Sequence, residues 1–466
     1  MSLDINARFE ELRKALEAGG LNAAPGTLNQ GSALQMQDLS NVMNVTCISD
    51  DQIKLQKMFP VKAAKQTMYE FRRQLDYGTL GSSAVLEGAI GEEETPTYVS
   101  AIVPMAYYVH YSRRTLQAEL VNTFDGKGPE ERLDEAAATK LAWDIEKDCF
   151  LGKAMYSNAG AFDGNILATP DRQEAGMRGF DQQVRSSDSD ITTHDLFFQE
   201  YGGNESVVLD QSGVLSQDII EDVKTLNALH NGNAKTLVLG PTAHGNYNKI
   251  AFPKERIILA GSPQKRTGAS LDAQDTVQGQ ISIESSRMLE PKTAPARLRG
   301  GTPAAPAVAA ATDIAAAGTS FIAGEQYVYF VTAQNARGEG AKSASQVAVV
   351  AATGDGQSIV ITPAAGLAAI SFNVYRSEAG GSKTAFIGRV KAQGSAAVTF
   401  IDLNYMKPFM MSAYAVDERS SHFAELSSFK SKELAQTDLT TPKAYYRFVT
   451  LGMHLPRFNV IVDNVR

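Results

Sequence analysis

The residues whose types could support chemistry are grouped most densely between positions 185 and 195, in "RSSDSDITTHD". Carboxylates combined with an imidazole are common ligands of metal ions. The spacing here does not follow a calcium-binding loop, and the glycine that fixes the turn of such a loop is missing. We therefore interpret the segment as a solvated acidic loop and predict no metal site. The four potential ligands are Asp188, Asp190, His194 and Asp195.

Other groups match catalytic or phosphate-binding patterns only in part. His230 and His244 flank a predicted buried strand, but neither lies near a nucleophile in an elbow or triad arrangement. The glycine-rich "LRGGTPAAP" lacks the Lys-Ser/Thr ending and the strand-to-helix context of a phosphate loop. Cys149 falls on the apolar side of a predicted helix, which favours a buried, unreactive thiol.

Three consecutive carboxylates, Glu92, Glu93 and Glu94, lie at the tip of a predicted hairpin. Neighbouring side chains of this kind do not converge on one atom, as an acid and a base acting on one substrate must. We interpret them as a solvated or partner-facing tip. Since no group of residues assembles into an active site, we predict that the protein is not an enzyme and uses no cofactor.

Composition excludes several further classes. The chain has 466 residues, 43% hydrophobic and 21% charged, which is ordinary for globular domains and is long enough for several. A net charge of -8 argues against a nucleic-acid binder with a basic surface. No apolar run is long enough to cross a bilayer, and the first 20 residues lack a signal peptide's apolar region. Two cysteines, Cys47 and Cys149, favour a reducing compartment, with assembly in a cytoplasm.

The elements that would position such residues begin with an N-terminal helix and a turn-rich arm. Ile5, Phe9, Leu12 and Leu16 share one helical face. A long two-stranded hairpin is predicted next, with flanks at 68–75 and 98–111 and a tip rich in Gly, Ser and Glu. Because an isolated hairpin is marginal in water, we expect it to rest on a neighbouring subunit.

A long helix is predicted over Pro129–Gly152. Proline in its first turn, acidic residues near the positive end of the dipole and glycine at its end all favour it. The residues on its apolar stripe are Leu133, Ala137, Leu141, Ile145 and Cys149. A second helix is predicted over Ser216–His230, followed by a buried strand in "AKTLVLGPTAHGNYNKI".

The composition changes between Pro303 and Asn404. This stretch holds 26 alanines and only 12 charged residues among its 102 positions. Six short strands are predicted there, separated by turn sequences, as in a β-sandwich of the immunoglobulin or fibronectin kind. After Asn404 the sequence again mixes charged, helical and strand patterns. We therefore interpret the sandwich as an insertion into a host domain. Its strands are predicted at 327–333, 346–352, 358–362, 370–376, 385–390 and 398–401.

Several stretches resemble segments of a known family. Those outside the sandwich are "YVHYSRRTL", "LAWDIEKDCFLGK", "AKTLVLGPTAHGNYNK" and "LPRFNVIVDNVR". The elements also follow a particular order: arm, hairpin, long helix, mixed region and returning strand. In these segments and in this order, the chain resembles the major capsid protein of tailed bacteriophages, which has the Hong Kong 97-type fold. Within the sandwich, "YVYFVTAQNARGEGAKS", "FNVYRSEAGG" and "VTFIDLN" resemble immunoglobulin-like modules of phage capsid proteins.

The resemblance implies an α+β fold with parts of known names. These are an N-terminal arm at 1–65, an extended hairpin loop at 66–113, a peripheral domain at 114–210 with its spine helix at 129–152, an axial domain and linker at 211–302, an inserted immunoglobulin-like sandwich at 303–404 and a return to the axial and peripheral domains at 405–466.

The function implied is structural. Copies of the chain would form the hexamers and pentamers of an icosahedral shell in the virion, with a portal protein and non-specifically contacted packaged DNA. Some relatives crosslink a hairpin lysine, but Gln74–Ser112 contains none. Others begin with a fused scaffolding region; here the arm begins near residue 1, so we expect a separate scaffolding protein. A decoration protein is a further expected partner, and no membrane is involved.

Two other functions stay open from the sequence. One is an encapsulin-like bacterial compartment, which shares the fold and encloses enzymes. The other is a surface adhesin that binds through the sandwich, which the missing secretion signal disfavours. For a shell, the residues expected to pair between subunits lie at the base and tip of the hairpin: Arg72, Arg73, Arg113 and Arg114, with Glu92, Glu93 and Glu94.

Overall fold

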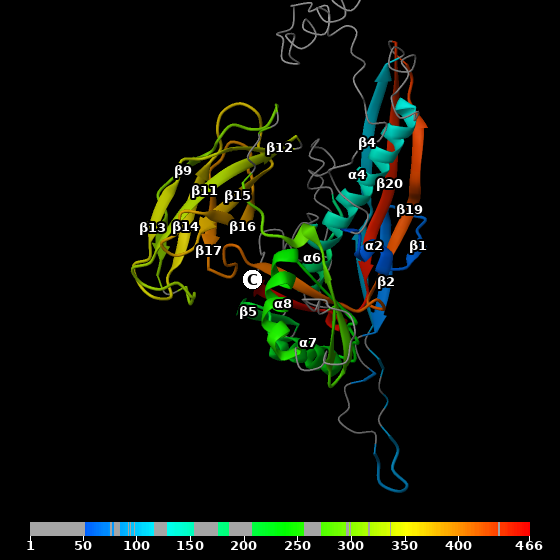
Figure 1. Ribbon diagram of the computed structural model, residues 1–466. Helices are drawn as coiled ribbons and strands as arrows, with labels where there is room; N and C mark the ends of the chain where they lie inside the picture. Colours follow the sequence, from blue (N-terminus) through cyan, green and yellow to red (C-terminus); the bar gives the residue numbers. More distant parts are fainter. Residues whose placement is uncertain are drawn as a thin grey trace, which may run out of the picture.

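The computed structural model places two sheets around a shared core and a third, two-layered β unit to one side (Figure 1). It describes residues 52–466 except 75–76, 79–83, 92, 94, 97, 116–127, 153–175, 186–206, 256–271, 295–297, 299, 316, 336 and 437–438. The described part is mixed α and β, with strands predominating. The predicted N-terminal helix, Cys47 and the acidic cluster at 188–195 lie outside it.

The six-stranded sheet contains the buried strand predicted after the helix at Ser216–His230. It is mixed: β5 pairs with β21 and β6 with β8 in parallel, whereas the other neighbours are antiparallel. The helices α7 (Gln217–Leu229) and α8 (Pro241–Glu255) accompany it, and the Ser216 hydroxyl caps α7 by accepting from the Ile219 amide. In order, its strands are β5 (Val208–Gly213), β21 (Val460–Val465), β18 (Met411–Val416), β6 (Thr236–Leu239), β8 (Gly279–Ser285) and β7 (Ala273–Thr276).

The four-stranded sheet supports the long helix, α4 (Pro129–Leu151). Its strands in order are β1 (Val61–Ala63), β19 (Ser421–Glu433), β20 (Thr440–Met453) and β4 (Ala106–Thr115). Of the predicted stripe of α4, Ala137, Leu141, Ile145 and Cys149 are buried, whereas Leu133 is half-buried. The short helices α2 (Leu55–Met58) and α6 (Phe180–Arg185) pack near it. The core between the two sheets includes Ile145, Phe150, Phe180, Tyr414, Phe423 and Ile461.

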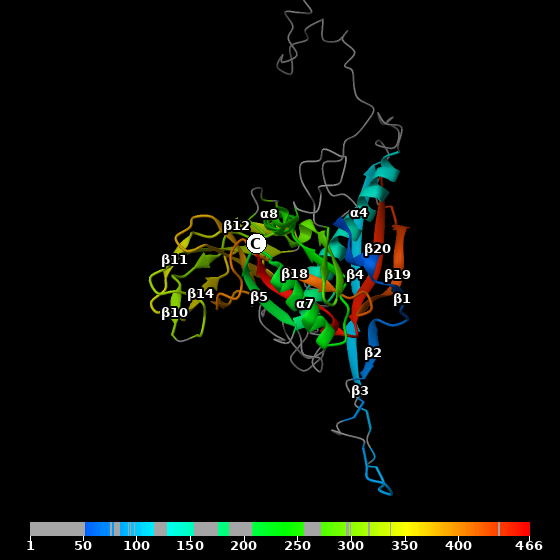
Figure 2. The same cartoon turned by 60° about the horizontal axis from the view of Figure 1, so that its bottom comes forward.

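The predicted hairpin is confirmed. The strands β2 (Met68–Gln74) and β3 (Tyr98–Pro104) pair along their whole lengths, from Met68 opposite Pro104 to Gln74 opposite Tyr98. The second flank does not continue to Tyr111 as one strand of the hairpin: after Met105 the chain enters β4, which pairs with β20 instead. Both views show the hairpin extending away from the rest of the protein (Figures 1 and 2).

All six strands predicted between residues 327 and 401 are present in a two-sheet sandwich. One sheet has the order β12-β11-β15-β16, with β13 also on β11; the other is β10-β14-β17, with β9 also on β14. A buried core shared by both sheets includes Tyr329, Val331, Ile359, Phe372 and Ile387. The strands of the sandwich are β9 (Ala307–Val308), β10 (Thr312–Ile314), β11 (Gln326–Asn335), β12 (Gly338–Lys342), β13 (Gln346–Val349), β14 (Gly356–Thr362), β15 (Ser371–Ser377), β16 (Thr384–Lys391) and β17 (Val398–Asp402).

The chain leading into the sandwich is more closely attached than a simple linker. The Phe386 amide of β16 donates to the Lys292 carbonyl at 2.9 Å, and Lys292 Nζ lies 2.7 Å from a Glu339 carboxylate oxygen. Glu339 also accepts from Tyr375 on β15 at 2.5 Å. Lys292 therefore takes part in the sandwich although it precedes Pro303.

Candidate functional site

The surface with the strongest functional character is the hairpin tip. Three large apolar side chains there have no cover: Val85, Leu86 and Ile90 are 55%, 85% and 96% exposed. Glu87 and Glu93 are also exposed. A tip that combines apolar and acidic side chains without burying any is suited to a partner surface.

The predicted pairing residues divide into three groups. Arg72 on β2 and Arg113 on β4 are exposed, as is Glu93 at the tip. Arg114 instead contacts its own chain, with ion pairs to Glu130 of α4 and to Glu433 of β19. Glu92 and Glu94 lie outside the described residues, and so does the side chain of Arg73. The exposed members stay predicted contacts between subunits.

A second surface lies on the four-stranded sheet, on the face turned away from α4. Side chains alternate along a strand, so Tyr107 and Tyr111 of β4 share this face with Tyr446 and Phe448 of β20. The Tyr107 and Phe448 rings meet edge to face at 5.0 Å, and Tyr446 stacks on Phe448 at 5.2 Å. We call these four residues the aromatic face. Tyr107 and Tyr111 are both about half exposed.

Basic side chains surround the aromatic face. Lys430 and Lys432 of β19 lie opposite Tyr446 and Ala444 in the register, and Arg113 of β4 lies opposite Pro442. Residues directly opposite each other in an antiparallel pair project on the same side of the sheet. The aromatic face is therefore apolar at its centre and positively charged at its edge. The hairpin tip also carries apolar side chains, but its charged residues are negative.

The other face of the same sheet is fixed to α4 by charged pairs. Lys443 of β20 donates to Glu130 and Asp134 of α4 at 3.0 and 2.9 Å. Near the other end of the helix, the Tyr108 hydroxyl donates to Asp148 at 2.8 Å and accepts from the Met177 amide. Burial of this carboxyl raises the pKa of Asp148 to about 6.

The last part of the predicted arm is held by one buried carboxylate. Glu146 of α4 accepts the backbone amides of Lys54, Leu55 and Gln56 at 2.8, 2.7 and 3.1 Å. These amides begin α2, where an acceptor satisfies donors that the helix itself leaves unpaired. Burial raises the pKa of Glu146, partly offset by these hydrogen bonds. This part of the predicted arm is thus attached to the C-terminal half of α4.

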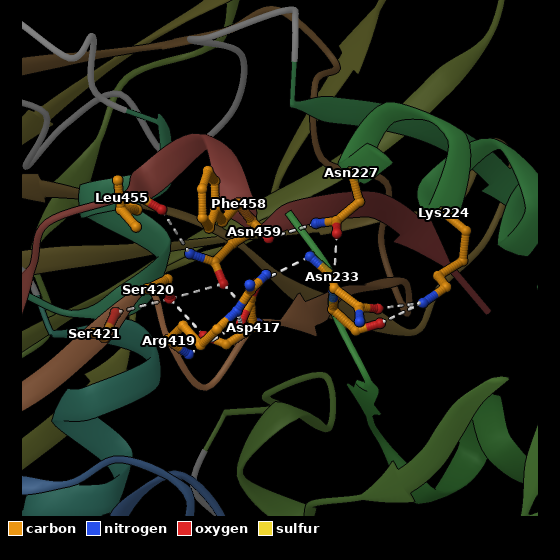
Figure 3. Close-up of polar contacts among 11 residues, drawn as sticks. Lys224, Asn227, Asn233, Asp417, Arg419, Ser420, Ser421, Leu455, Phe458 and Asn459 are labelled. Carbon is orange, nitrogen blue, oxygen red and sulfur yellow. Dashed lines mark hydrogen bonds and ion pairs between the residues drawn. The ribbon is translucent and has the colours of Figure 1, made fainter. Parts of the chain in front are cut away.

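A polar corner joins the two sheets where the chain crosses between them (Figure 3). Asp417, between β18 and β19, accepts from the Asn233 amide at 2.8 Å and pairs with Arg419. Asn459, just before β21, accepts from the Asp417 amide and from the Ser420 hydroxyl at 2.9 and 3.1 Å. The chain passes between the two sheets once from β18 to β19 and once from β20 to β21. Because hydrogen bonds between Asp417, Ser420 and Asn459 join these two connections, the polar corner fixes the orientation of one sheet relative to the other.

The helix α7 extends the polar corner. Asn227 donates to the Phe458 carbonyl and accepts from the Ala234 amide, and Lys224 donates to the Ala234 carbonyl at 2.8 Å (Figure 3). None of these residues stood out in the sequence, since each is a common polar type at unremarkable spacing. Their role follows from contacts between segments far apart in the chain.

Three of the residues considered for chemistry, His230, His244 and Cys149, lie in the described part of the chain. His230 ends α7 and His244 lies in the first turn of α8, at opposite ends of β6. Cys149 is fully buried, and burial raises its pKa well above the ordinary value, in agreement with an unreactive thiol. The described part of the chain holds no cluster of three potential metal ligands. None of its helices combines the length and apolar composition needed to cross a bilayer.

No family model and no curated protein matches this chain. Among solved structures, it is similar to the capsid of a native GTA particle, with 10% identity, a TM-score of 0.48 and coverage of 96% of this chain and 100% of that one. The capsid of the cyanophage P-SCSP1u matches at 9% identity and TM-score 0.45, covering 95% of this chain and 98% of that one.

A third similar structure belongs to another class of shell. It is the SrpI encapsulin complex from Synechococcus elongatus PCC 7942, at 6% identity and TM-score 0.38, covering 95% of this chain and 96% of that chain. The similar structures named here are thus two capsids and one encapsulin complex.

Proposed function

We propose that this chain is the major capsid protein of a tailed bacteriophage, and that its copies assemble into the icosahedral shell that encloses the genome. The observation that carries the proposal is the extended hairpin with its uncovered apolar tip. Such a tip serves no purpose in an isolated chain, because large exposed apolar side chains favour association. A repeated shell supplies a partner for every copy.

The hairpin tip would dock on the aromatic face of a neighbouring subunit. Val85, Leu86 and Ile90 would cover the exposed rings of Tyr107 and Tyr111. The acidic residues of the tip would lie near the basic edge of that face, formed by Arg113, Lys430 and Lys432. Matched charge favours the correct register more than it adds affinity. Burial of apolar area would supply most of the free energy, at about 25 cal/mol per Å².

The remaining parts have roles that follow from this arrangement. The four-stranded sheet with α4 would be the peripheral domain, and the six-stranded sheet the axial domain at the centre of a Hong Kong 97-like capsomer. The sandwich would be an immunoglobulin-like module carried on the shell. The expected partners are a separate scaffolding protein, a portal protein, a decoration protein and packaged DNA.

Electron microscopy of the purified recombinant protein tests this function. We expect closed shells or ring-shaped capsomers when the chain is expressed with a scaffolding protein from the same genome. Only monomers under these conditions would contradict the proposal, and a secreted monomer that binds cells through the sandwich would favour an adhesin. Shells filled with one enzyme rather than with DNA would favour an encapsulin-like compartment.

A further inference from the structure

Two histidines lie where the extended hairpin meets the four-stranded sheet. His422 on β19 is 2% exposed, and its Nε2 lies 2.7 Å from the Tyr69 hydroxyl of β2. Its Nδ1 lies 3.3 Å from Nδ1 of His454, which directly follows β20. The three side chains form a continuous polar chain from the hairpin, through β19, to the end of β20.

The packing around these side chains is close. The Tyr69 and His422 rings meet edge to face at 5.3 Å, and Phe71 approaches His422 in the same way at 6.4 Å. Gly452 lies directly opposite His422 in the β19–β20 register. A Cβ there would lie 3.3 Å from both the His422 and the Tyr69 rings, so glycine leaves the room in which the hairpin base meets the sheet.

The number of protons decides whether the histidine contact attracts or repels. Two facing Nδ1 atoms form a hydrogen bond only when one carries a proton and the other does not. Two neutral rings meet this condition when they take opposite tautomers, one protonated at Nδ1 and the other at Nε2. The Tyr69 hydroxyl then donates to Nε2 of His422 or accepts from it, depending on which ring carries the Nδ1 proton. When both rings are protonated, two donors and two positive charges face each other.

The surroundings of His422 oppose its protonation. Burial is the main cause and lowers the pKa of His422 to about 4, and the charges of Lys62 on β1 and of His454 act in the same direction. Within the described part of the chain, none of the groups that shift this pKa is a carboxylate. The neutral form is therefore the one that the folded contact requires.

We propose that Tyr69, His422 and His454 form a pH-sensitive latch that holds the base of the extended hairpin against the four-stranded sheet and opens in acid. The direction follows from the preference for neutral rings: the latch is closed above the ordinary histidine pKa of about 6.5 and weakens as the pH falls from there towards 4. The β2–β3 ladder itself does not involve the histidines, so the hairpin would move as a unit about Met105. The latch lies within one chain and does not depend on the proposed function.

Pulsed electron paramagnetic resonance on the full chain, kept unassembled, tests the latch. Nitroxide labels would be attached at Arg72→Cys on β2 and Lys140→Cys on α4, with Cys47→Ser so that the buried Cys149 is the one natural cysteine left. At pH 7.5 we expect one narrow distance distribution. At pH 4.5 we expect it to broaden or shift, while the circular dichroism spectrum stays unchanged.

Variants separate the latch from a general effect of acid. The double variant His422→Gln/His454→Gln cannot become charged, so its distribution should be the same at both pH values. His230→Gln, at the end of α7, is the matched control and should respond like the parent. A parent distribution that does not change with pH would overturn the proposal, as would a full response in the double variant.

A milder variant covers the case in which the double variant does not fold. Tyr69→Phe keeps the ring packing and removes only the hydroxyl that bonds to His422. We expect its distribution to be broad already at pH 7.5. A distribution as narrow as that of the parent at pH 7.5 would show that the hydroxyl does not hold the hairpin, and would overturn the latch as proposed.

Discussion

Arg185 and Asp463 form a bidentate ion pair in the interior, with Nη1–Oδ2 and Nη2–Oδ1 distances of 2.7 and 2.6 Å. The pair joins α6 to β21, the C-terminal strand of the chain, which lies between β5 and β18 in the six-stranded sheet. Asp181 accepts from Arg185 Nε at 2.8 Å and from the Tyr414 hydroxyl at 3.2 Å. The carboxylates on both sides raise the pKa of the arginine against the effect of its burial.

Removing the arginine should be strongly destabilising. Arg185→Met would leave two buried carboxylates without their cation, and loss of one partner of a buried pair costs about 3–5 kcal/mol. Lys140→Met breaks the exposed Lys140–Asp144 pair of α4 and should cost no more than about 0.5 kcal/mol. Urea unfolding followed by the fluorescence of Trp143, the single tryptophan, measures both. Equal midpoints for the two variants would contradict this assignment.

Charge reversal at the hairpin tip should impair assembly. Replacing Glu92, Glu93 and Glu94 by Lys would place like charges against the basic edge of the aromatic face. Each exposed pair is worth only about 0–1 kcal/mol, but a shell repeats the loss in every copy. We expect a lower yield of particles and a lower dissociation temperature, whereas the exposed Glu418→Lys should leave both unchanged. Unaltered yield and stability in the triple variant would exclude the charge pairing.

Mature particles should show no covalent ladder on denaturing gels. The hairpin segment Gln74–Ser112 has no lysine to act as the nucleophile of an isopeptide bond. Cys149 is buried in the core of its own subunit, so a disulfide mesh through it is excluded. Boiled and reduced particles should run as one band of about 50 kDa. A series of bands of higher mass would overturn this prediction.

The sandwich should fold alone, and should be more stable when the segment that leads into it is included. A fragment of residues 291–406 keeps the Lys292–Glu339 ion pair and the hydrogen bond from Arg376 to the Met406 carbonyl. A fragment of 303–404 loses both and leaves Glu339 without its cation, which we expect to cost about 1–3 kcal/mol. Thermal unfolding of the two fragments measures the difference.

The host should build capsomers without the sandwich. We expect residues 291–406, replaced by a short Gly/Ser linker, to be dispensable for ring formation in electron micrographs. If the longer fragment is unfolded on its own, or the shortened host forms no capsomers, the sandwich belongs to the core of the shell.

The stability contributed by Asp148 should depend on pH. Its pKa is about 6 in the folded protein and 3.8 in its ordinary state. A raised pKa means that the contribution is full below about pH 4 and is lost as the pH rises through 6. Asp148→Asn has no such dependence, so its stability relative to the parent should rise by about 1–2 kcal/mol between pH 4 and 7, after allowance for partial exposure. A constant difference in urea midpoints across this range would contradict the assignment.

Much of the local structure could be predicted from the sequence. The helix α4 follows from proline and glutamates at its start and from apolar residues recurring every three or four positions. The six sandwich strands follow from two-residue alternation bounded by turn sequences. These patterns involve neighbours within a few residues of each other, so the sequence carries them directly.

The tertiary structure alone decided which distant segments meet. The return limb of the hairpin leaves β2 at Met105 because β4 pairs with β20, more than 300 residues later. Arg114, expected to contact another subunit, pairs with Glu130 and Glu433 of its own chain. The pairing of β19 with β20 brings His422 to His454, and His422 in turn contacts Tyr69 of β2. Such contacts form because distant segments bury their apolar side chains in one common core, not because of the conformational preferences of neighbouring residues. The periodicity of the sequence therefore does not predict them.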